Sequence, residues 1–315
     1  MTATVLRRLL SLDPRELIRA VPGPPARDPA VARTLESVVV SFATGYNAGL
    51  GGPPGGIDLS HLAPELRGFA YEGAAMSLGI LDLMTLGGGR RVREFLDGPA
   101  APYVHLAHVG AGWSFCRMHV RPWVGVRAAQ PLFRWLAWDG WGFHQAFFRA
   151  RAVVERHHVE RAARGAVRPI RDQGVGRALW FYTGAEPEVV GEVIGGFPPG
   201  RRPDLWAGIG LAAAYTGAQP PERLVELLGH AGDHAPHVAQ GAAFAAKAHE
   251  HSGIVPERTA AAVEALTGAD VATAARWTDD SLAAVRHLPD DPGTYEAWRA
   301  GIRRAWARQK GGVAS

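Results

Sequence analysis

The chain has 315 residues, 47% of them hydrophobic, and a formal net charge of +4, which is the composition of an ordinary globular protein. This composition excludes general disorder, and a charge so close to balance gives no indication of nucleic-acid binding. The single cysteine, Cys116, excludes an internal disulfide.

Glycine and proline clusters divide the chain into segments rich in Ala, Leu, Arg and Glu. Because alternating runs of β-branched residues are scarce, helix is favoured almost everywhere, and we predict an all-α protein. In chain order we expect an N-terminal amphipathic segment (1–27), helical half 1 (28–165), helical half 2 (166–292), and a basic C-terminal helix with a tail (293–315).

The N-terminal segment shows neither the uninterrupted apolar stretch nor the cleavage site of a secretory signal. Glycine, proline or histidine interrupts the two long, nearly uncharged stretches, 37–57 and 98–116, so neither predicts a membrane helix. Further along, residues 131–164 are expected to form one helix of about nine turns, weakened by Gly140 and Gly142.

Residues 295–308 are expected to form an amphipathic C-terminal helix. Trp298, Ile302 and Trp306 share one face, while arginines such as Arg299 lie on the other. This helix either caps the core or docks on anionic lipid or a partner protein. We therefore expect a cytoplasmic protein, with attachment to the membrane periphery as the alternative.

Three short patterns recur in the same order in the two halves. The pattern Arg-x-x-x-aromatic-x-Gly occurs at 67–73 and 202–208, and His-Val-x-x-Gly-x-x-Phe at 108–115 and 237–244. Gly45 corresponds to Gly176, and the three offsets are 135, 129 and 131 residues. This recurrence predicts an internal duplication, with two similar helical halves packed around an apolar cleft.

Several glycines stand in the middle of expected helices, where each costs about 1 kcal/mol relative to alanine. Either they let two helices cross closely, or they leave room for a ligand against the helix. The glycines concerned are Gly73, Gly110, Gly112, Gly208, Gly210 and Gly241.

Five blocks of sequence carry a family resemblance. They are Arg67–Met76, His108–Trp113, Asp139–His144, Asp172–Phe181 and Gln240–Lys247. In this order they resemble a family known from enediyne antitumour antibiotic gene clusters, catalogued as domain-of-unknown-function family 1702. The resemblance runs from about residue 42 to residue 249. It implies a role beside an iterative polyketide synthase, on the way from a linear polyene to the enediyne core, and it supplies no catalytic residues.

Motifs of nucleophilic hydrolases, nucleotide phosphate loops, zinc proteases and paired-cysteine sites do not occur, so we assign no cofactor and no metal. The candidate catalytic residues are Glu72, His108 and Asp139. Glu72 has no counterpart in the second half, where Ala207 stands, and burial in an apolar helix raises the pKa of a carboxyl group. His108 either transfers protons or merely donates one hydrogen bond to a carbonyl.

Arg67 and Arg202 occupy equivalent positions in the recurring pattern. Either they hold a carboxylate or phosphate of a ligand, or they form ion pairs with Glu72 and Asp204 respectively. Further candidate ligand contacts are aromatic and polar residues of the same motifs, and for the aromatic ones the alternative role is to form the core. These residues are Tyr71, Trp113, His144, Asp172, Arg177, Trp180, Trp206 and His237.

The resulting hypothesis is an accessory protein of enediyne polyketide biosynthesis that acts on a linear polyene or its cyclising intermediate. The alternative is a non-catalytic carrier or scaffold that binds this apolar polyketide-derived molecule and docks other proteins of the cluster, membrane proteins included. A helical interaction protein without a small ligand is a third possibility. Whether the protein is an enzyme stays open, and no nucleic acid is expected as a partner.

Overall fold

The computed structural model describes residues 9–122 and 130–313, and within these residues the secondary structure is helical, without β-strands. The all-α prediction is therefore confirmed. Short 3-10 turns join many of the helices. The α-helices are α2 (Pro14–Arg19), α3 (Pro29–Gly49), α4 (Arg67–Met84), α5 (Arg90–Leu96), α6 (Val104–Arg117), α7 (Leu136–Phe148), α8 (Arg168–Tyr182), α9 (Pro187–Gly196), α10 (Arg202–Thr216), α11 (Pro221–Ala231), α12 (Ala235–Ser252), α13 (Glu257–Thr267), α14 (Val271–Val285) and α15 (Pro292–Val313).

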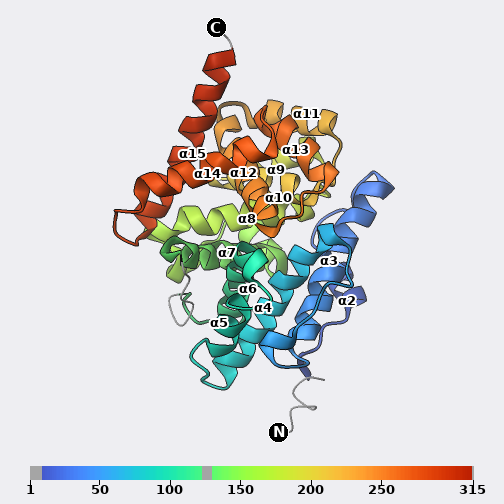
Figure 1. Cartoon of the computed structure of the whole chain (residues 1–315). Helices are drawn as coiled ribbons and strands as arrows, with labels where there is room; N and C mark the ends of the chain where they lie inside the picture. The colour runs from blue at the N-terminus through green and yellow to red at the C-terminus, as the bar shows by residue number, and fades with distance from the viewer. Residues whose placement is uncertain (1–8, 123–129, 314–315) are drawn as a thin grey trace.

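Seven helices form a series in which each packs against the next: α3, α4, α6, α7, α8, α10 and α12. Figure 1 shows α7 and α8 in the middle of the molecule, with α3–α6 on one side and α9–α14 on the other. Helices α13, α14 and α15 pack on α12, and α2 packs on α3. None of the described helices is both long and apolar enough to cross a membrane.

Glycines set the distance between the helices of this series. A Cβ added to Gly142 of α7 would lie 1.8 Å from the carbonyl oxygen of Arg171, and one added to Gly174 of α8 would lie 1.8 Å from that of Asp139. Such separations exclude any side chain larger than hydrogen. Reciprocal pairs of the same kind join α3 to α4, α6 to α7, α8 to α10 and α10 to α12: Gly45 with Gly73, Gly112 with Gly140, Gly176 with Gly208, and Gly210 with Gly241.

The tight-crossing interpretation of these glycines is confirmed, since each of them faces backbone of a neighbouring helix. From α4 onwards, one crossing glycine in each helix of the series recurs every 30 to 37 residues, at positions 73, 110, 140, 174, 208 and 241. This interval is much shorter than the offset of about 131 residues from which a duplication is predicted, and the duplication stays a prediction.

The expectation of one helix over 131–164 is wrong. Helix α7 begins at Leu136 and ends at Phe148, and a π-helical turn and two 3-10 turns follow before α8. The backbone of His157 is left-handed, with φ +53°. Two buried arginines stabilise this irregular stretch, because Arg201 donates to the carbonyl of His157 and Arg171 to that of His158.

Helix α15 caps the core from Trp298 to Trp306. Trp298 and Ile302 are buried, and Trp306 Nε1 donates to the carbonyl of Thr267 at 3.0 Å. The placement of Arg299 on a solvated face is wrong, because its side chain is fully buried. It pairs with Asp204 at 3.0 Å, so the second face of this helix also contacts the protein.

Candidate functional site

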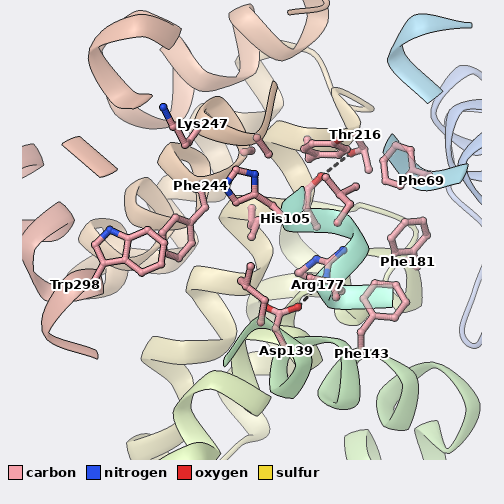
Figure 2. A pocket seen from close by; sticks show the side chains of 18 residues that line it. Phe69, His105, Asp139, Phe143, Arg177, Phe181, Thr216, Phe244, Lys247 and Trp298 are labelled. Carbon is pink, nitrogen blue, oxygen red and sulfur yellow. Dashed lines mark hydrogen bonds and ion pairs between the residues drawn. The ribbon is translucent and has the colours of Figure 1, made fainter. Parts of the chain in front are cut away.

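A pocket lies on the inner side of the helix series and receives side chains from α4, α6, α7, α8, α10, α12 and α15 (Figure 2). It spans about 740 Å³ of space between atoms, open solvent included. Aromatic and aliphatic side chains form most of the wall, and Asp139 and Arg177 are the ion pair on it. We call this space pocket A.

The inward position of the polar residues follows from the glycine crossings. A residue directly before the first glycine of a Gly-x-Gly pair and one directly after the second are four apart, so they share one helix face. In α7 these residues are Asp139 and Phe143, and in α8 they are Gln173 and Arg177. Glu72 stands directly before the glycine of α4 that faces α3. The crossings therefore direct these side chains towards a common interior.

Arg177 lies between two buried carboxylates. Its Nη1 donates to Asp139 Oδ1 at 2.7 Å, and its Nη2 lies 3.4 Å from both oxygens of Glu72. Trp113 Nε1 donates to Glu72 Oε1 at 3.1 Å. Glu72 is 2% exposed and Asp139 is fully buried, so two carboxyl groups share one guanidinium away from water.

This arrangement shifts the pKa of Glu72, the acid that the sequence analysis selected. Burial raises the pKa of Glu72 above its usual value; the charge of Arg177 opposes the shift, and that of Asp139 adds to it. A carboxyl group that keeps its proton to a higher pH can give a proton to a neighbouring molecule or take one from it. Glu72 is therefore the candidate acid–base group of the site.

Two glutamines extend the network beyond the ion pair. Gln173 Nε2 donates to Asp139 Oδ2 at 2.8 Å, and Gln240 Nε2 donates to Gln173 Oε1 at 3.3 Å. Arg299 Nε then donates to Gln240 Oε1 at 3.2 Å. Sequence reasoning missed both glutamines, although each stands directly before a crossing glycine, as Asp139 does.

Arg67 and Arg202 make the same backbone hydrogen bonds. The Nε of each donates to the carbonyl five residues earlier, and the Nη2 of each donates to the carbonyl seven residues earlier, at 2.7–3.0 Å. The expected ion pairs with Glu72 and Asp204 do not form, because both carboxylates pair with arginines of other helices. Neither Arg67 nor Arg202 lines pocket A.

His108 makes the hydrogen bond to a carbonyl that is the alternative to proton transfer: its Nδ1 lies 2.7 Å from the carbonyl oxygen of Val104. Burial lowers the pKa of His108 to about 4, and burial also lowers the pKa of His144 and of His237 to about 3. These three histidines are not among the residues lining pocket A. All three are therefore expected to be neutral near pH 7.

The structure brings Glu72, Trp113, Asp139 and Arg177 together, and it places the other predicted contacts elsewhere. The rings of Tyr71 and Tyr103 stack with centroids 4.3 Å apart. Asp172 accepts hydrogen bonds from Arg171 and Arg201, Trp180 donates to Thr216 at the wall of pocket A, and Trp206 is buried. A ligand-binding role for these residues stays a prediction.

His144 gives a prediction about acid stability. Neither ring nitrogen has a hydrogen-bond partner among the described residues, and the folded-state pKa of about 3 lies below the usual 6.5. Below pH 6.5 His144 therefore takes up a proton in the unfolded chain but stays neutral in the folded chain. The free energy of unfolding consequently decreases as the pH falls. We expect His144→Leu to reduce the loss of unfolding free energy between pH 7 and pH 5 by about 2 kcal/mol, measured by urea unfolding.

The control for this experiment is His61→Leu, since His61 is exposed to solvent. It should leave the pH dependence of the unfolding free energy as in the wild type. An unchanged pH dependence in His144→Leu would contradict the burial of a neutral imidazole at this position.

Comparison with known proteins gives one match. The model of the family described as "Protein of unknown function (DUF1702)" matches residues 1–306. Neither the search of curated proteins nor the search of solved structures gave a match.

Proposed function

The chain belongs to the DUF1702 family, and on this premise we propose that it binds a linear polyene or its cyclising product in pocket A and acts on it during maturation of an enediyne polyketide. The enediyne setting rests on the resemblance of the five sequence blocks. The observation that carries the binding proposal is pocket A itself, a mostly apolar space with the buried Asp139–Arg177 ion pair on its wall.

The wall of pocket A suits a flat, apolar ligand. Phe69, Phe143, Phe181, Phe244 and Trp298 contribute aromatic surface, against which a conjugated chain can stack. Asp139 and Arg177 already satisfy one another at 2.7 Å, so the ligand needs no compensating charge. Lys247 also lines the wall and pairs with Glu250 and Asp279. The chemistry of the wall therefore favours a long hydrocarbon chain, with at most one charged end, over a small polar metabolite.

Glu72 supplies the chemical part of the proposal. Glu72 is not among the residues that line pocket A, but it contacts Arg177, which does line it. Its raised pKa allows it to exchange a proton with a ligand that extends from pocket A past Arg177, and the guanidinium stabilises the carboxylate that donation leaves behind. Proton transfer of this kind would serve isomerisation or ring closure of a polyene.

The test is metabolite profiling of a producing strain that carries an in-frame deletion of the gene. We expect the deletion strain to accumulate a linear polyene, wild type to restore the product, and Glu72→Gln to fail, because the amide keeps the shape of the side chain but carries no transferable proton. Glu192→Gln, at an exposed position of α9, is the matched control and should restore the product. Thermal unfolding checks that each variant is folded.

Two other outcomes would contradict parts of the proposal. Restoration by Glu72→Gln would remove Glu72 from the mechanism and favour the carrier, a role that the internally paired charges also permit. Unchanged enediyne output from the deletion strain would contradict the enediyne setting altogether.

A further inference from the structure

A second pocket adjoins pocket A. It encloses about 430 Å³ between atoms, open solvent included, and we call it pocket B. Phe69, Phe143, Arg177 and Phe181 line both pockets. The two spaces therefore share part of their wall, made by these four residues.

The two pockets extend in different directions from this shared wall. Figure 2 shows Trp298 and Phe244 on one side of pocket A, and the three shared phenylalanines on the opposite side. Pocket B is formed beyond them by residues of α2 and α3, among them Leu17 and Val38, which do not line pocket A. Its wall is apolar except for Glu72, Arg177 and the indole nitrogen of Trp113.

The three phenylalanine rings of the shared wall can move without breaking a hydrogen bond, whereas Arg177 is held by Glu72 and Asp139. Phe143 packs edge-on against Phe181, with ring centroids 5.8 Å apart, and the Arg177 guanidinium lies 5.1 Å from the Phe143 ring centroid. Side chains change rotamer far more readily than helices move, and a flat chain between two rings keeps the aromatic contact that it interrupts. The wall can therefore open to a narrow, unbranched molecule.

We propose that pockets A and B form one continuous site for a single elongated chain, which runs from Trp298 past the shared phenylalanines to Leu17. The inference rests on the proposed function for the apolar character of the ligand. It adds that the ligand is long and unbranched. The middle of the chain, not its end, lies against Arg177 and Glu72, which line pocket B at the junction. Phe69, Phe143 and Phe181 then select for unbranched chains, and the distance from Trp298 to Leu17 sets the preferred length.

The test measures affinity as a function of chain length. Parinaric acid, a fluorescent conjugated tetraenoic acid of eighteen carbons, is bound to the full-length protein and displaced by straight-chain fatty acids of eight to twenty carbons. In the wild type, affinity should increase with length beyond the chain that fills pocket A alone. Leu17→Trp fills the far end of pocket B. It should weaken the binding of chains of sixteen carbons or more at least tenfold and leave the affinity for the shortest chains unchanged.

Two further variants make the result interpretable. Phe147→Trp adds bulk to pocket B from α7 and should shorten the preferred chain in the same way, which keeps the test open if Leu17→Trp folds poorly. Val225→Trp adds the same indole at an exposed position of α11 and should leave every affinity unchanged.

The outcomes separate this inference from the proposed function. Saturable binding with the same length profile in wild type, Leu17→Trp and Phe147→Trp would overturn the continuous site, while pocket A would remain a binding site. Absence of saturable binding for parinaric acid would overturn the proposed function, and the inference with it.

Discussion

Replacing Gly174 by alanine should lower the free energy of unfolding by about 3 kcal/mol, even though alanine is the better helix former by about 1 kcal/mol. The added Cβ would lie 1.8 Å from the carbonyl oxygen of Asp139 and 2.9 Å from the backbone nitrogen of Phe143. Both are backbone atoms of α7, so no rotamer change can relieve the clash. Helices α7 and α8 would have to separate, which would also move Asp139 away from Arg177.

The matched control is Gly229→Ala in α11, where an added Cβ meets no atom within 4 Å. That change should raise stability by about 0.5–1 kcal/mol, because only helix propensity acts. Urea unfolding followed by circular dichroism measures both. Equal stability of Gly174→Ala and the wild type would contradict the close crossing of α7 and α8 on which the geometry of the site depends.

Replacing Arg177 by methionine should cost about 3–5 kcal/mol of unfolding free energy at pH 7, because it removes the guanidinium that contacts both Glu72 and Asp139. Methionine fills much of the same space, so the loss reports on charge more than on packing. The loss should shrink as the pH falls towards 5, since Glu72, whose pKa burial already raises, neutralises itself by taking up a proton.

Two controls accompany Arg177→Met. Arg67→Met removes an arginine that bonds two backbone carbonyls and Tyr103 but no buried carboxylate, so it leaves no unpaired buried charge and should cost less. Adding Glu72→Gln and Asp139→Asn to Arg177→Met should restore part of the stability, because no unpaired charge is then buried. If Arg177→Met lowers the unfolding free energy by the same amount at pH 5 and at pH 7, the presence of an ionised group at the centre of the site is contradicted.

The part of the site that could be predicted from the sequence consists of residues whose chemistry conflicts with their local surroundings. Glu72 and Asp139 are acids within apolar, glycine-containing helices, and this conflict marks them as unusual wherever their partners lie. Gln173 and Gln240 occupy the equivalent position, but an uncharged amide raises no such conflict, so their part in the network appears only once the helices are packed.

The failed predictions have a common physical cause. Arg299 has the spacing of a solvated helix face, and its burial depends on Asp204 and Gln240, which lie 95 and 59 residues earlier in the chain. The end of α7 likewise depends on arginines of later segments that bind the carbonyls of the irregular stretch. Helical periodicity reports on local order and on the polarity of a face, but it does not report which distant side chain will meet that face.

The central claim is that pocket A binds a long apolar molecule, and the most direct measurement is the fluorescence titration of the full-length protein with parinaric acid. We expect the wild type to bind parinaric acid saturably. Leu211→Trp fills pocket A from α10 and should weaken this binding at least tenfold, whereas Val225→Trp should leave it unchanged. Absence of saturable binding, or equal binding by Leu211→Trp and the wild type, would contradict the claim.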